Sequence, residues 1–215
     1  MQPEFWQACW ENNHLGFQLD NVHPMLENLL PKLDLAIKGV FVPLCGKSLD
    51  LAFLAKHYKV VGAELSDIAC RDFFAEQQLS PLITADGGFT RYETEQICLW
   101  NGDYFNLPQQ AVAQCQFIYD RAALVALPLM MRKQYAEKTL SLFKSRTRML
   151  LIAVEYPEHE KEGPPFSVSQ SELADLFPLA DIKILAQVDL TGCGFAKRRF
   201  AVSKLIETAY LITFN

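Results

Sequence analysis

Apolar runs rich in β-branched residues alternate with amphipathic segments along most of the chain. Such runs are typical of buried strands, and the segments between them repeat apolar residues at helical spacing. The expected strands span residues 40–43, 59–64, 97–100, 115–119, 149–154, 182–190 and 205–214. The expected helices begin near Phe5 and continue with residues 22–30, 48–57, 67–77, 130–143 and 169–177.

This alternation predicts an α/β fold with a doubly wound, mostly parallel sheet covered by helices on both faces. The last two expected strands have no helix between them, so we expect them to form a C-terminal antiparallel hairpin at one edge of the sheet. Residues 80–95 contain Pro81, Asp86, Gly87 and Gly88, which indicate turns.

The composition narrows the class of protein. At 215 residues, half of them hydrophobic, we expect one folded domain over residues 1–215. The net charge of -5 argues against a nucleic-acid partner. The six cysteines form no C-x-x-C pair and the four histidines are scattered, so we expect no metal site.

The chain also gives no sign of a membrane partner. The longest apolar run, residues 122–131, is interrupted by Pro128 and is too short to span a bilayer. The opening residues lack the pattern of a signal peptide. We therefore expect a cytoplasmic protein in a reducing compartment, and nothing in the sequence demands more than a monomer.

Candidate chemistry lies after the first two expected strands. Glu64 follows Leu44 by twenty residues and ends the second apolar run. A carboxylate at that position can accept hydrogen bonds from both hydroxyls of a ribose, while the loop after the first strand lies against the rest of a nucleoside. The carboxyl ends of the strands in such a sheet meet at one rim, which would also receive Asp103 and Arg121. We therefore expect an adenosine-type cofactor there.

Three nucleotide-binding interpretations compete for this loop. A phosphate-binding P-loop needs glycine five positions before Gly46, where the chain has Phe41. A dinucleotide fold needs the pattern G-x-G-x-x-G, whereas this loop has one glycine behind Pro43 and Leu44. S-adenosyl-L-methionine has no phosphate and requires a ribose-binding carboxylate, apolar walls and a backbone loop, which suit the sequence best.

The motifs resemble those of one family. The chain contains F-V-P-L-C-G-K-S-L-D at residues 41–50, Y-D-R-A-A-L-V-A-L at 119–127 and G-P-P-F-S-V at 163–168, with F-W-x-x-x-W near the start. Together they resemble the thiopurine S-methyltransferase family, class I enzymes that use S-adenosyl-L-methionine and have a Rossmann-like fold. The resemblance runs in order from Phe5 to about Thr213.

The resemblance implies roles for particular residues. It places Trp6, Trp10, Leu44, Glu64, Asp103, Tyr104 and Arg121 at the cofactor, and Phe17 and Arg121 at the substrate. It also implies that residues 1–35 form a helical cover over the cofactor site. The chain departs from the family pattern at Gln18, where many members carry His, and in residues 192–200, where no clear pattern is found.

The resemblance implies methyl transfer to the sulfur of aromatic or heterocyclic thiols, thiopurines included, and to selenium and tellurium species in detoxification. Such transfer depends on alignment, which alone can lower a barrier by roughly 7–11 kcal/mol. We expect Arg121 to hold the anionic substrate or lower its pKa, with no dedicated general base. The alternatives are a cofactor-binding protein without catalysis, or a methyltransferase acting on oxygen or nitrogen.

Several of these residues also have simpler interpretations. Asp103 follows Asn101 and Gly102 and can serve a turn alone. Asp120 can pair with Arg121 or cap the next helix. Cys45 has no evident histidine partner and is expected to pack in the core. Residues 197–199 are expected to be a solvated charge run.

Overall fold

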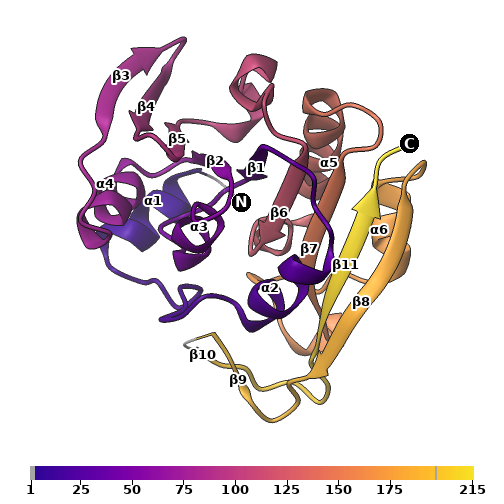
Figure 1. Ribbon diagram of the computed structural model, residues 1–215. Helices are drawn as coiled ribbons and strands as arrows, with labels where there is room; N and C mark the ends of the chain where they lie inside the picture. Colours follow the sequence, from indigo (N-terminus) through magenta and orange to yellow (C-terminus); the bar gives the residue numbers. More distant parts are fainter. Residues whose placement is uncertain (1–2, 197) are drawn as a thin grey trace. The chain divides into compact units, whose positions relative to one another are not determined.

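The computed structural model describes residues 3–196 and 198–215, coloured along the chain in Figure 1. Met1 and Gln2, the start of the expected N-terminal cover, and Lys197 of the charge run lie outside the described residues. The chain divides into two compact units, residues 1–116 and 117–215. The expectation of a single domain stays a prediction.

Parallel strands form the centre of the first unit. β1 (Gly39–Val42) pairs with β2 (Lys59–Glu64), and β2 pairs with β5 (Ile97–Asn101), both in parallel. All four residues of β1 are buried, as expected for a strand that is covered on both faces. The carboxyl ends of these three strands therefore lie at the same edge.

The helices of the first unit begin at serine caps. The Ser48 hydroxyl accepts the Asp50 amide at the start of α3 (Leu49–Leu54), and the Ser66 hydroxyl accepts the Ala69 amide at the start of α4 (Asp67–Glu76). Before β1 come α1 (Pro3–Glu11), α2 (Pro24–Leu29) and the 3-10 turn η1 (Leu30–Lys32). Two further 3-10 turns, η2 (Tyr104–Asn106) and η3 (Gln109–Val112), follow β5.

The turn expected in residues 80–95 is present at Gly87 and Gly88, but it joins two strands that were not predicted from the sequence. β3 (Leu82–Asp86) and β4 (Phe89–Glu93) form an antiparallel hairpin, and β4 continues the ladder onto β5. Only Gly87 and Gly88, both with positive φ, form the turn, as the two-residue loops of hairpins require. Leu82 and Ile83 are both exposed, so β3 lacks the alternating burial from which a strand is recognised.

The second unit holds the strand order β6-β7-β11-β8. β6 (Phe117–Arg121) and β7 (Arg148–Glu155) are parallel, whereas β11 (Ile206–Thr213) is antiparallel to both β7 and β8 (Asp181–Asp189). This confirms the expected C-terminal antiparallel hairpin, with β8 as its outer strand. β6 lies two residues later than expected, because pairing with β7 extends to Arg121 opposite Ile152.

Two helices accompany these strands. α5 (Leu129–Leu142) follows the 3-10 turn η4 (Leu124–Ala126), and α6 (Gln170–Leu176) begins where the Ser169 hydroxyl accepts the Glu172 amide. The 3-10 turn η5 (Glu158–Glu160) lies between β7 and α6, and the short strands β9 (Gly194–Phe195) and β10 (Arg198–Arg199) pair with each other.

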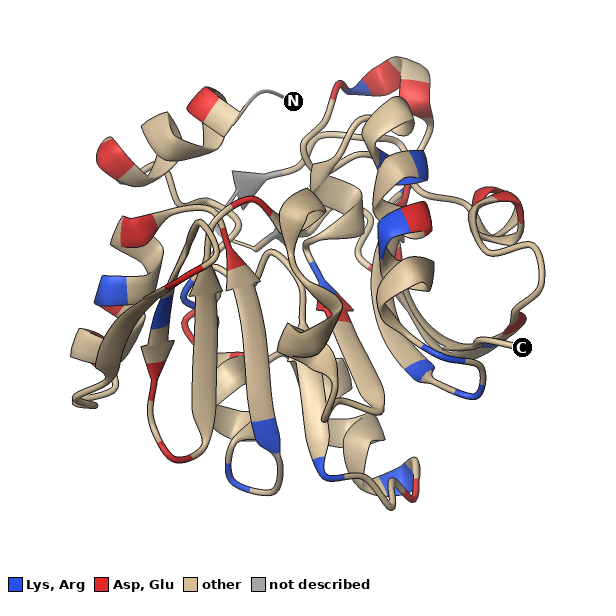
Figure 2. Cartoon of the chain, turned by 90° about the horizontal axis from the view of Figure 1, so that it is seen from above, with Lys and Arg blue, Asp and Glu red and all other residues tan. Residues whose placement is uncertain are grey.

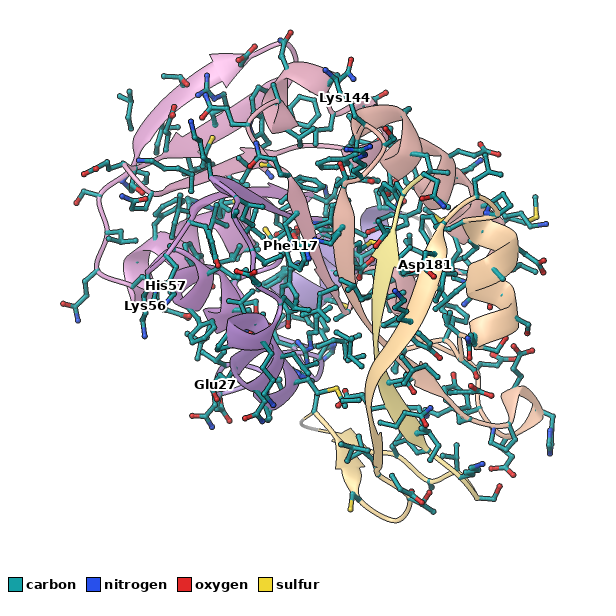
Figure 3. The ribbon with its side chains drawn as sticks, turned by 45° about the vertical axis from the view of Figure 1, so that its right-hand side comes forward. Glu27, Lys56, His57, Phe117, Lys144 and Asp181 are labelled. Atoms are coloured by element: carbon teal, nitrogen blue, oxygen red, sulfur yellow. The ribbon has the colours of Figure 1, made fainter. Side chains whose placement is uncertain are left out.

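Charged residues lie mostly outside the central strands, whose residues are largely apolar and buried. In Figure 2 the strands are mostly tan, while the acidic and basic residues gather on helices, loops and strand ends. Figure 3 shows Glu27, Lys56 and His57 pointing away from the ribbon, whereas Phe117 is completely buried. Within residues 3–196 and 198–215, none of the helices combines the length and apolar character that a bilayer crossing needs. The α/β class with parallel strands at its centre is confirmed.

Candidate functional site

The loop after β1 is held in a strained, tightly bound conformation. Leu44 and Gly46 both have positive φ, 44° and 54°, which is unfavourable for a leucine. The Cys45 amide donates to the Ala63 carbonyl of β2 at 3.0 Å and ties the loop to the neighbouring strand. Strain of this kind at the end of a strand is found at ligand-binding sites, where the surrounding contacts maintain it.

Glu64 is the main anchor of this loop. Its Oε2 accepts the Gly46 amide at 2.8 Å, and its Oε1 accepts the Ser66 amide at 2.7 Å. Burial raises the pKa of Glu64, and hydrogen bonds from the backbone of Ser66, Gly46 and Leu65 partly oppose that rise. Because an ionised carboxylate has roughly four acceptor positions, both oxygens keep the capacity to accept another donor.

Trp10 reaches the same loop from α1. A Cβ atom added at Gly46 would lie 3.3 Å from Cζ2 of Trp10, so the indole ring packs directly on the Gly46 backbone. Trp10 is buried, and its ring meets Phe17 edge-on with 5.7 Å between the centroids. Trp6, which is half-buried, meets Phe17 edge-on at the same distance. The structure thus brings Trp6, Trp10 and Phe17 into one aromatic cluster beside the loop.

The N-terminal segment makes two further contacts with this region. The Gln18 amide group donates to the Lys47 carbonyl at 3.0 Å. The His23 backbone amide donates to Oδ1 of the buried Asp50 in α3 at 2.8 Å. Gln18, the departure from the family pattern, therefore connects the N-terminal segment to the loop after β1.

Asp103 and Tyr104 have different environments after β5. Asp103 is exposed, and its Oδ1 accepts the Phe105 amide while its Oδ2 accepts the Asn106 side chain, both at 3.0 Å. This is the turn role anticipated for it. Tyr104 is buried and stacks on Phe41 of β1 with 6.3 Å between the ring centroids.

Lys47 and Cys45, the two other candidate residues of the loop after β1, have structural rather than chemical roles. The Lys47 ammonium pairs with Asp72 at 3.2 Å and with Glu76 at 2.6 Å, both on α4, which argues against a P-loop lysine. Burial, and then the nearby Glu64, raise the pKa of the Cys45 thiol well above its usual range. Cys45 therefore stays neutral, as a packing residue would.

In the second unit, Arg121 is the last residue of β6 and is half-buried. The next residue, Ala122, has a φ of 64° and turns the chain sharply. The preceding residue, Asp120, is completely buried, and its Oδ1 accepts the backbone amides of Ala123 and Leu124. Of the two anticipated roles for Asp120, the structure shows the capping of the segment that follows.

A model of the thiopurine S-methyltransferase family matches residues 1–215. The chain belongs to the thiopurine S-methyltransferase family. It is 43% identical over 218 residues to thiopurine S-methyltransferase of Pseudomonas fluorescens strain SBW25, covering all of both chains. It is 41% identical to the protein of that name from Photobacterium profundum, covering 99% of each chain.

Solved structures support the fold. A methyltransferase from Anabaena variabilis that depends on S-adenosyl-L-methionine has a TM-score of 0.69 at 16% identity, covering 99% of this chain and 95% of its own. A Burkholderia thailandensis N-methyltransferase with bound S-adenosylhomocysteine has a TM-score of 0.62 at 12% identity, covering 99% and 87%. These likenesses confirm the class I methyltransferase fold.

Family membership makes the protein a methyltransferase that uses S-adenosyl-L-methionine. The residues present fit that cofactor. A buried carboxylate with acceptor capacity on both oxygens suits a ribose, and the Trp10 ring packed on the Gly46 backbone supplies an apolar wall beside it.

Sequence reasoning did not assign the backbone amides of Gly46 and Ser66 to the site, although both orient Glu64. Ser66 performs two tasks, because its hydroxyl caps α4 while its backbone amide orients Glu64. The available signal was local, because a carboxylate two residues before a helix cap can accept the cap's own amide.

The exposed cap at Asp103 gives a first testable prediction. Asp103→Ala removes the acceptor of the Phe105 amide and should lower the free energy of unfolding by about 1 kcal/mol, measured by urea denaturation. Asp103→Asn keeps an acceptor and should recover most of that loss. Titration with S-adenosyl-L-methionine then tells whether Asp103 only caps the turn or also contacts the cofactor. If Asp103→Asn has normal stability but binds the cofactor more weakly, Asp103 contacts the cofactor.

Proposed function

We propose that this protein transfers the methyl group of S-adenosyl-L-methionine to the sulfur of aromatic and heterocyclic thiols, including thiopurines. The observation that carries the proposal is the 43% identity to a curated thiopurine S-methyltransferase over the whole of both chains. The proposal extends to selenium and tellurium nucleophiles, which are soft, polarisable anions like thiolates, and so to a role in detoxification.

For the cofactor we propose that Glu64 binds the ribose hydroxyls. Leu44, Trp6 and Trp10 line the neighbouring wall, and Asp103 and Tyr104 lie on the adenine side. The two backbone amides on Glu64 support this role, because they fix the carboxylate in one orientation before any ligand arrives. A preorganised acceptor loses little conformational entropy on binding.

For the reaction we propose that Arg121 holds the anionic substrate, with Phe17 as part of its apolar wall. When bound, S-adenosyl-L-methionine supplies an electrophilic methyl group on a positively charged sulfur. The protein's task is then to orient a nucleophile that is already ionised, so no general base is assigned. A guanidinium suits this task because it stays charged and donates from a rigid planar group.

We propose further that the protein is a cytoplasmic monomer of one domain, with residues 1–35 covering the cofactor. The six cysteines are all free thiols, which supports a reducing compartment. Trp10 on the Gly46 backbone and the Gln18–Lys47 hydrogen bond support the cover. Light scattering of the purified protein tests the monomer.

The substrate proposal is tested with nucleophiles that differ in one atom. We expect methylation of thiophenol, benzeneselenol and 6-mercaptopurine by radiolabelled cofactor, and little methylation of phenol and aniline. The three benzene compounds with sulfur, oxygen and nitrogen share one ring, so the comparison isolates the attacking atom. Faster methylation of phenol or aniline would replace the proposal with an oxygen or nitrogen methyltransferase.

Glu64→Gln tests the ribose contact. The amide keeps one acceptor oxygen where the carboxylate had two, so affinity for S-adenosylhomocysteine should fall about 10- to 100-fold, measured by calorimetry. Glu155→Gln is the matched control, because Glu155 is also the last residue of a strand but is exposed. Equal affinities of the two variants would contradict the role of Glu64.

Arg121→Ala tests the substrate contact. Loss of the cation should lower kcat/KM for a thiol about 30-fold or more, because the thiolate loses its charged partner. Affinity for the cofactor should change much less, and Arg121→Lys should show an intermediate rate because it keeps the charge without the planar donor group. Equal losses of transfer and cofactor binding would count against the assignment.

A further inference from the structure

A buried hydrogen-bond centre lies directly beside Arg121 in the second unit. The Asp120 carboxyl accepts the amides of Ala123 at 3.3 Å and Leu124 at 3.2 Å on Oδ1. Its Oδ2 accepts the Tyr135 hydroxyl of α5 at 2.6 Å. Asp120 and Tyr135 are both completely buried, so these contacts are shielded from competing water.

These hydrogen bonds determine the path of the chain after Arg121. Pairing with β7 fixes the backbone as far as Arg121, which lies opposite Ile152. Ala122 then adopts a φ of 64°, a conformation that is unfavourable for a residue with a side chain. The two amides bound by Asp120 lie immediately beyond this strained residue, so the carboxyl stabilises the sharp turn.

The same turn anchors a second motif. The Val125 carbonyl, one residue beyond the capped amides, accepts the Phe166 amide at 2.6 Å. Phe166 belongs to the G-P-P-F-S-V segment, and its ring lies 5.7 Å from the Arg132 guanidinium of α5. The Asp120 carboxyl therefore connects the end of β6, which carries Arg121, to the backbone that receives the Phe166 loop.

Asp120 reaches the segment beyond Arg121 through the backbone amides of Ala123 and Leu124. Its influence passes through the backbone of the turn. We propose that Asp120 and Tyr135 are positioning residues for methyl transfer, which hold Arg121 and the Phe166 loop in the geometry that the substrate requires. This inference rests on the proposed function and adds residues outside the expected site.

Several ionisable groups lie near this carboxyl in sequence or contact its segment. Tyr119 and Arg121 flank it on β6, and Tyr135 and Arg132 face the turn from α5, where Arg132 pairs with Glu172 at 2.7 Å. Burial raises the pKa of Asp120 to about 6, and hydrogen bonds from Tyr135, Leu124 and Ala123 partly oppose the rise.

Protonation would weaken the turn in a predictable direction. A neutral carboxyl accepts weaker hydrogen bonds than a carboxylate, and its own proton must be accommodated at Oδ2. The rate of methyl transfer should therefore fall as the pH drops through about 6. Loss of the Tyr135 hydroxyl removes a hydrogen bond that favours the charged form, so it should move this fall to higher pH.

The experiment measures kcat with saturating cofactor between pH 5 and 8, using a nitro-substituted aromatic thiol that stays ionised over the whole range. Asp120→Ala should lower kcat about 100-fold at pH 7.5 through misplacement of Arg121. Asp120→Asn keeps an acceptor for both amides, should lose about tenfold or less, and should abolish the acidic fall in rate. Tyr135→Phe should keep the fall but shift it upward.

Two controls separate positioning from general stability. Thr139→Val removes another buried hydroxyl of α5, which donates to the Tyr135 carbonyl at 2.7 Å, and should leave the pH profile unchanged. Affinity for S-adenosylhomocysteine should change much less than kcat in all variants that fold. If Asp120→Ala fails to fold, the pH profiles of Asp120→Asn and Tyr135→Phe still decide the question.

Two results would overturn the inference. The first is an acidic fall in rate that persists unchanged in Asp120→Asn. The second is a wild-type kcat in variants whose only defect is a lower melting temperature, which would make the centre purely structural. A wild-type protein that methylates no thiol would instead overturn the proposed function, and the inference with it.

Discussion

The first unit depends on a carboxylate that joins two strand ends through the backbone. Glu64 binds the amide of Gly46 in the loop after β1 and the amide of Ser66 at the start of α4. Without those hydrogen bonds, a fully buried charge would be strongly unfavourable, and its raised pKa shows that burial still outweighs them. An anion kept in this state is ready to accept further donors, which is the property that a ribose site needs.

The same arrangement recurs in the second unit. Asp120 is also a buried acid near the end of a parallel strand, and it also accepts two backbone amides. Both of these lie beyond the positive-φ residue Ala122, whereas of the two amides on Glu64 only that of Gly46 lies beyond such a residue, Leu44. In both units a strained residue with positive φ makes the chain turn sharply just after a strand. This residue is Leu44 after β1 and Ala122 after β6. The cost of that strain, about 1–3 kcal/mol per residue, is offset by charge-assisted hydrogen bonds of similar size.

Sequence reasoning recovered what periodicity and capping determine. The expected strands are present, and so are the helices expected near residues 48, 67 and 169, because apolar spacing and a serine before a helix are local signals. The β3–β4 hairpin was missed because its outer strand is exposed and is held by backbone pairing rather than by burial. The roles of the Gly46 and Ser66 amides were missed because all residues except proline carry a backbone N–H. The sequence therefore does not indicate which of these groups binds a side chain.

Glu64 and Asp103 are both acids near the carboxyl end of a parallel strand, but they differ in burial and in the hydrogen bonds they accept. Both follow parallel strands, and position alone does not separate them. Asp103 is exposed and uses both oxygens on its own turn, so water competes for any further contact. Glu64 is buried and oriented by amides from two segments, so water competes less for its oxygens. Burial and orientation, rather than the acid itself, therefore separate the two carboxylates.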